Sequence, residues 1–156
     1  FKAPSMRFFN AKQIKFTLYS ASVYMLAISV SAGTAAKTLP DPMVSNLFAL
    51  TDVAASLQIC SKSKVYVSLT ESDKTSIRRL MRNIDKLITT MAETYDPSLI
   101  KFYLVQRSEL SESPAKLNEM RQRYGYCGNG MIADIRRYVY TSKKMLDEFF
   151  KAYNRR

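Results

Sequence analysis

The side chains best suited to chemistry in this sequence are three pairs of closely spaced carboxylates. Two carboxyl groups that flank a substrate can act as the acid and the base of glycoside cleavage. A simpler interpretation fits each pair better: the first pair lies in the first turn of a helix, the second at a helix end and in the linker that follows, and the third opposite an apolar stripe. We therefore expect no active site at these pairs, which are Glu71 and Asp73, Glu109 and Glu112, and Asp147 and Glu148.

Histidine is absent from the whole chain of 156 residues. Its absence excludes Ser/His/Asp and Cys/His catalysis, histidine-based zinc sites and the Glu-x-x-His pattern of di-iron bundles. The sequence also lacks a phosphate loop, a dinucleotide fingerprint and an EF-hand. We expect a non-enzymatic protein with no metal, no cofactor and no small-molecule substrate.

Two cysteines, Cys60 and Cys127, are the next candidates for chemistry. An even number of cysteines in an exported chain predicts a single disulfide bond. Neither residue belongs to a C-x-x-C pair, which argues against a redox-active role. The alternative is two buried free thiols in a reducing compartment.

Positive charge is in surplus, with 24 Lys and Arg residues against 13 Asp and Glu and a net charge of +11. Basic side chains with tyrosines among them recur along the expected second helix and from position 121 to the C-terminus. These residues predict a binding surface, and the alternative is a solvated helix face that keeps the protein soluble. The predicted partner-binding residues are Arg78, Arg82, Lys86, Arg123, Tyr126, Arg136, Arg137, Tyr140 and Lys144.

The charge pattern of residues 1–36 predicts an export signal. Basic residues precede an uncharged stretch, residues 16–36, which ends in small side chains, and the chain has no acidic residue before Asp41. This pattern is typical of a cleaved signal peptide or of a single membrane anchor, with Met6 as the start and Phe1–Ser5 as a remnant of processing or of an expression vector. The third alternative is a buried or disordered segment of a cytosolic protein.

Export determines which partners we expect. Basic patches with aromatic residues can bind nucleic acid, but an exported protein does not meet it. We expect the partner to be an acidic protein or a larger membrane assembly, and an anionic lipid or an envelope polymer is a further candidate. The domain would be periplasmic or secreted, or else anchored to the membrane with the bundle in the periplasm or an organellar lumen.

Proline and glycine positions predict an all-α fold for residues 42–156, after a linker at 37–41. Three prolines directly follow a capping residue, at Asp41-Pro42, Asp96-Pro97 and Ser113-Pro114, and each pair marks a helix start. Between Gly33 and Gly125 the chain has no glycine, whereas a sheet protein needs frequent turn residues. We expect an up-down bundle of four to five helices with one disulfide bond.

The expected helices cover about 42–62, 70–95, a third from Pro97, 114–125, and a last one after the Gly128-Asn129-Gly130 turn. Ser68 and Glu71 predict a capping box before the second helix. That helix has the clearest amphipathic pattern. Val65–Val67 is expected to be a linker. The two cysteines would join the first helix to the last at one end of the bundle.

These observations leave two functions open, both non-enzymatic. In the first, the protein is an exported binding protein whose basic, tyrosine-bearing face contacts an acidic partner. In the second, it is an accessory subunit of a membrane complex, anchored by residues 16–36, with the bundle on the non-cytoplasmic side.

Overall fold

The computed structural model describes residues 39–62, 69–125 and 127–153, all of which belong to the second of the chain's two units, residues 36–156. These residues form five helices and no strand, so the all-α prediction is confirmed for them. The expected export segment and Val65–Val67 lie outside the described residues. The helices are α2 (Asp41–Lys62), α3 (Glu71–Thr94), α4 (Ser98–Glu112), α5 (Pro114–Tyr124) and α6 (Asn129–Tyr153).

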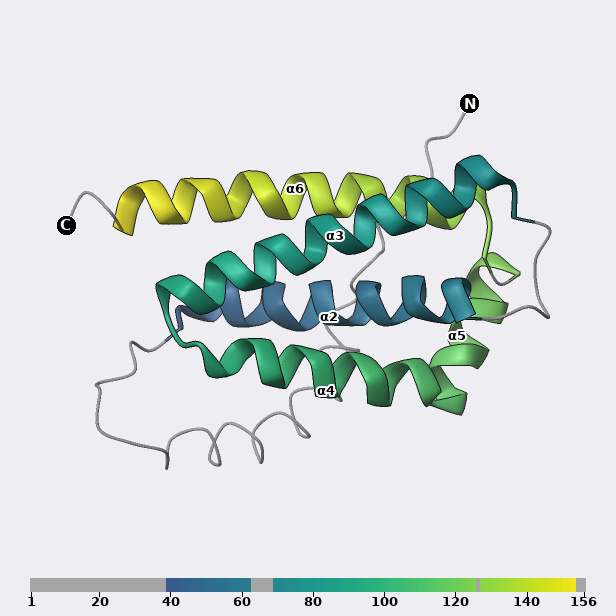
Figure 1. Ribbon diagram of the computed structural model, residues 1–156, viewed down its shortest axis with the longest axis horizontal. Helices are drawn as coiled ribbons and strands as arrows, with labels where there is room; N and C mark the ends of the chain where they lie inside the picture. Colours follow the sequence, from purple (N-terminus) through teal and green to yellow (C-terminus); the bar gives the residue numbers. More distant parts are fainter. Residues whose placement is uncertain (1–38, 63–68, 126, 154–156) are drawn as a thin grey trace. The chain divides into compact units, whose positions relative to one another are not determined.

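The helices form a bundle in which α2 and α3 are the inner pair (Figure 1). Helix α4 packs against both inner helices on one side, and α6 packs chiefly against α3 on the other. The short helix α5 packs on α4 and α2 at one end. Consecutive long helices reverse direction from α2 to α4, while α6 runs in the same direction as α3. The predicted up-down arrangement is therefore confirmed.

The two inner helices bury different amounts of their surface. Helix α2 has buried side chains almost all around its second half, from Leu50 to Cys60. Helix α3 buries only the stripe that runs from Ile77 to Met91 and leaves its opposite side in solvent. This difference follows from sequence, because α2 carries few charges, whereas charged residues recur on α3 between the apolar positions.

The three predicted helix starts are confirmed to within one residue, but only Ser113-Pro114 has the predicted roles of capping residue and first helical residue. Helix α2 already begins at Asp41, and the capping residue of α4 is Pro97, so the two aspartates are not the capping residues that were expected. The Ser113 hydroxyl accepts a hydrogen bond from the backbone N–H of Lys116, with Pro114 in the first turn of α5. The Asp96 carboxylate accepts from the backbone N–H of Ser98 at 2.9 Å. Helix α5 ends at Gly125, whose φ of 58° lies in the left-handed region that glycine adopts without steric cost.

The capping box of α3 lies two residues beyond its predicted position. Thr70 is the capping residue: its hydroxyl accepts from the Asp73 N–H, and the Asp73 carboxylate accepts from the Thr70 N–H. The Thr-x-x-Asp sequence offers the same reciprocal geometry as the expected Ser68 and Glu71. Glu71 instead forms an ion pair with Lys74. Helix α6 also begins earlier than expected, at Asn129 inside the predicted turn.

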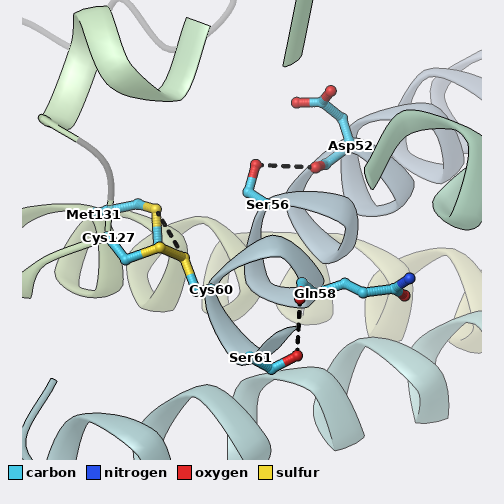
Figure 2. The surroundings of a disulfide bond; sticks show 7 residues. All are labelled: Asp52, Ser56, Gln58, Cys60, Ser61, Cys127 and Met131. Carbon is cyan, nitrogen blue, oxygen red and sulfur yellow. Dashed lines mark hydrogen bonds between the residues drawn. A yellow bond between two sulfur atoms is a disulfide. The ribbon is translucent and has the colours of Figure 1, made fainter. Parts of the chain in front are cut away.

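The predicted disulfide bond joins Cys60, in the last turn of α2, to Cys127, just before α6 (Figure 2). Both cysteines are buried, and the Cys60 Sγ lies 4.0 Å from the Met131 Sδ of α6. The bond closes a loop with a sequence separation of 67 residues. In the chain-entropy model, such a loop stabilises the folded state by about 4 kcal/mol.

Among the described residues, α2 is the one helix long and apolar enough to cross a membrane. However, 67% of its most apolar window is buried inside the bundle. Partner helices therefore already cover this apolar surface, as is usual for the central helix of a folded domain.

Candidate binding surface

Seven exposed basic residues and one exposed tyrosine lie on the solvent sides of α3 and α6, and we call them the basic face. All eight side chains are on helices that pack against each other. The basic face consists of Arg78, Arg79, Arg82 and Lys86 on α3 and Arg136, Arg137, Tyr140 and Lys144 on α6.

On α3 the helical repeat places these residues opposite the buried stripe. Arg78, Arg82 and Lys86 are spaced four residues apart and form one row, the α3 row. Ile77 and Ile84, which are buried, belong to the other side of the same helix. The packing of α3 on the core therefore fixes the direction in which the α3 row points.

On α6 the same spacing recurs. Arg136, Tyr140 and Lys144 form the α6 row, again at intervals of four residues. Tyr140 is 71% exposed, which is unusual for an aromatic side chain with no role in the core. The Arg136 guanidinium donates a hydrogen bond to the Ser76 hydroxyl of α3 at 3.4 Å. This contact places the start of the α6 row at the same level along the bundle as the start of the α3 row, although Arg78, two residues after Ser76, points to another side of α3.

The cations of the basic face lack carboxylate partners. In the described ranges, no ion pair within 4.0 Å includes any of the seven basic residues. Arg78 bonds to the hydroxyl of Thr75 at 3.2 Å, a neutral partner. No acidic residue occurs between Asp134 and Asp147 on α6. Asp85 lies on α3 between Arg82 and Lys86, but its carboxylate accepts hydrogen bonds from Tyr103 and Arg107 of α4, and no described ion pair neutralises the basic face.

One described residue of the predicted set, Arg123, does not lie on this face. Arg123 lies on α5, which packs on α4 and α2, and its guanidinium forms an ion pair with Glu119 at 3.4 Å. Tyr126 lies outside the described residues. The structure thus brings together seven of the nine predicted partner-binding residues, and Arg79 extends the same surface.

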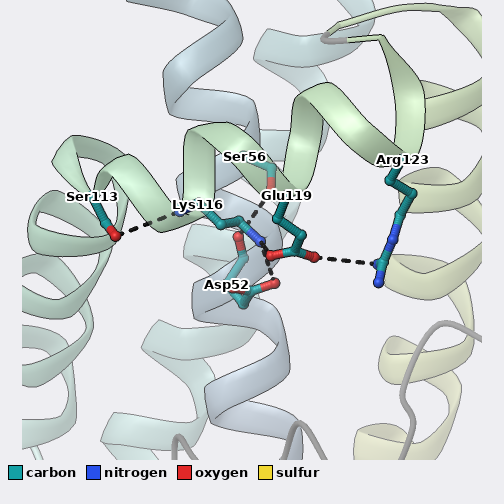
Figure 3. A network of polar contacts seen from close by, with 6 residues as sticks. All are labelled: Asp52, Ser56, Ser113, Lys116, Glu119 and Arg123. Atoms are coloured by element: carbon teal, nitrogen blue, oxygen red, sulfur yellow. Dashed lines mark hydrogen bonds and ion pairs between the residues drawn. The ribbon is translucent and has the colours of Figure 1, made fainter.

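A buried lysine, which the sequence analysis did not single out, holds α5 against α2 (Figure 3). The Lys116 side chain is only 5% exposed, and its ammonium group contacts Asp52 at 2.7 Å and Glu119 at 3.1 Å. Glu119 in turn pairs with Arg123. Burial of a lysine requires such partners, because an unpaired charge in the interior is costly. Lys116 therefore has a structural role.

A second polar cluster ties α3 to α4. The Tyr103 hydroxyl donates to Asp85 at 2.6 Å, and Arg107 donates to the same carboxylate at 3.0 Å. The Arg107 guanidinium also lies over the Tyr103 ring, 4.9 Å from its centroid. Burial and the adjacent Asp85 carboxylate raise the pKa of Tyr103 above its ordinary value. The phenol therefore stays neutral and acts as a fixed donor.

At least one carboxylate of each pair is engaged by a residue close to it in the sequence. Glu71 pairs with Lys74, Asp73 caps α3, Glu109 accepts from Gln106, and Asp147 pairs with Lys143. Helix α4 extends through Glu112, which the sequence analysis placed near its end. In the described part of the chain, no group of three or more Cys, Asp or Glu side chains is arranged to hold a metal ion.

Comparison of the chain with protein-family models, curated proteins and solved structures finds no match.

Proposed function

We propose that this protein is a non-enzymatic binding protein whose basic face contacts an acidic protein. The observation that carries the proposal is the group of seven exposed cations that form no ion pair within the described residues. Such a cluster produces a positive potential that attracts an acidic surface and raises the rate of association.

The residue types of the basic face support a protein partner. Arginine and tyrosine are enriched at protein interfaces and among the residues that contribute most to binding. Tyr140 offers an exposed aromatic ring between two cations of the α6 row. A face that served only to keep the protein soluble would have no need of this ring.

The proposal places the domain outside the cytoplasm. The disulfide bond fits an oxidising compartment, and the charge pattern of residues 1–36 fits export. The intact mass of the native protein tests this location: loss of everything before about Lys37 is expected for a free exported domain. A full-length protein in the membrane fraction would instead assign it to a membrane complex.

The function is tested by partner capture from the native source with three forms of the protein. The first is wild type, and the second carries Arg78→Glu, Arg82→Glu and Lys86→Glu. The third is a matched control with Lys62→Glu, Lys101→Glu and Arg121→Glu, which changes the net charge equally but lies off the basic face at exposed positions.

The expected result is an acidic protein that wild type and the control variant retain, that the face variant loses, and that high salt elutes. Capture of the same proteins by all three forms would overturn the proposal, because binding would then not depend on the basic face.

A further inference from the structure

We infer that the partner contacts the basic face with an acidic helix of about two turns, which lies along the α3 row beside α6. This inference rests on the proposed function. Three properties of the basic face support this partner: its length, the acidic residues that flank it and the spacing of its cations.

The basic face is short. The α3 row and the α6 row each extend over eight residue steps, which correspond to about 12 Å of helix. Because α3 and α6 run in the same direction and Arg136 contacts Ser76, the two rows start within a few residues of each other (Figure 1). A ligand that contacts both rows is therefore about two helical turns long.

Acidic residues flank the two rows, and Asp85, whose carboxylate accepts hydrogen bonds from Tyr103 and Arg107 of α4, lies between Arg82 and Lys86. Glu71 and Asp73 precede the α3 row, and Glu93 follows it. Asp134 precedes the α6 row, and the pair Asp147 and Glu148 follows it. Lys74 and Lys143 pair with Glu71 and Asp147. The repulsion that a long uniform polyanion or an anionic membrane would meet therefore comes from Glu93, Asp134 and Glu148, which form no ion pair among the described residues. A short acidic segment of a protein, with other residues on either side, avoids this repulsion.

The spacing of the cations matches a helix. Residues four apart on α3 are separated by about 6 Å along the axis, and acidic residues four apart on a partner helix have the same separation. Ser76, Asn83 and Thr90 repeat every seven residues, and Ser76 marks this side of α3 as the one beside α6. These side chains are uncharged, so the strip of α3 between the two rows does not repel an acidic helix.

The test uses two synthetic peptides of identical composition. In the first, glutamates repeat every four residues over two turns within a neutral, alanine-rich helix. The first peptide also has one proline at its end. In the second peptide this proline stands at the centre instead, where it prevents helix formation. Binding of each peptide to the oxidised, full-length protein is measured by fluorescence anisotropy. Inorganic polyphosphate and vesicles that contain phosphatidylglycerol are tested separately as alternative ligands. The protein forms are wild type, the face variant and the off-face control variant defined above.

We expect wild type and the control variant to bind the helical peptide at least about tenfold more tightly than the proline-interrupted peptide. The face variant should lose at least about tenfold of the affinity for the helical peptide. Polyphosphate and vesicles should bind more weakly than the helical peptide at physiological salt.

Other outcomes separate the two proposals. Equal binding of both peptides to wild type, with loss in the face variant, would overturn the helical partner and leave the proposed function standing. Tighter face-dependent binding of polyphosphate or vesicles would also overturn the helical partner. Peptide binding that is equal in wild type and the face variant would overturn both.

Discussion

Positive charges in two regions of this molecule have opposite surroundings. The inner cations, Lys116 and Arg107, are largely buried, and each contacts a carboxylate of another helix at 3.0 Å or less. The cations of the basic face are exposed and form no ion pair within the described residues. One sequence thus uses the same residue types in two different ways.

The inner cations therefore position helices, whereas the cations of the basic face are available to bind a partner. Lys116 holds α5 on α2, and Arg107 holds α4 on α3, so their removal should affect stability. The basic face contributes nothing comparable to packing, so its removal should affect binding.

The largest effect is expected from the disulfide bond, on which both regions depend. Cys127→Ala should lower the free energy of unfolding by about 4 kcal/mol, because the unfolded chain regains the entropy of a long open loop. Denaturant titration of the oxidised wild type and the variant measures the difference. A loss below about 1 kcal/mol would show that packing alone holds this end of the bundle.

Lys116→Met tests the inner cations and should cost about 2 kcal/mol. The expected loss is smaller than that for a fully buried pair, because Asp52 and Glu119 remain about one third exposed and can be hydrated. The matched control is Lys143→Met, which removes an exposed pair with Asp147 and should cost less than about 0.5 kcal/mol. Equal losses in the two variants would contradict the distinction between inner and outer charges.

Stability should fall as the pH rises from about 10 to about 12. Burial, aided by the nearby Asp134 carboxylate, raises the pKa of Tyr124 from 10.0 to about 12. The folded state therefore retains a proton that the unfolded state has lost, so the stabilisation is complete below pH 10 and disappears as the pH approaches 12.

Denaturant unfolding at a series of alkaline pH values measures this effect. Tyr124→Phe should reduce the decline, while the lysines, which lose their charge in the same range, contribute equally to both proteins. Identical pH profiles would show that the Tyr124 phenol is not linked to folding.

The smallest effect on stability is expected for the basic face. Arg78→Glu, Arg82→Glu and Lys86→Glu together should change the free energy of unfolding by less than about 1 kcal/mol, because no described ion pair is lost. Thermal unfolding of this variant and of the off-face control variant provides the comparison. A large loss would assign these cations a structural role.

The helical fold could be predicted because its signals are local. Aspartate–proline and serine–proline pairs marked three helix starts to within one residue, and the apolar stripe of α3 follows directly from the helical repeat. The position of the capping box was wrong by two residues because Ser68 with Glu71 and Thr70 with Asp73 offer nearly the same pattern.

The inner cations could not be predicted in the same way. Nothing near Lys116 in the sequence distinguishes a buried lysine from an exposed one, because its partner Asp52 is 64 residues away. The alignment of the α3 and α6 rows likewise depends on a contact between residues 60 apart, Arg136 and Ser76. Arg123 was grouped with the basic face because charge alone does not reveal its pairing with Glu119.

The central claim, that the basic face is the surface that binds an acidic partner, is tested most directly by mapping backbone amide chemical shifts during titration with the helical acidic peptide. We predict that the changes concentrate in residues 78–86 of α3 and 136–144 of α6 and diminish with added salt. Changes concentrated instead on α4, where Ile100, Leu104 and Val105 are exposed, would contradict the claim.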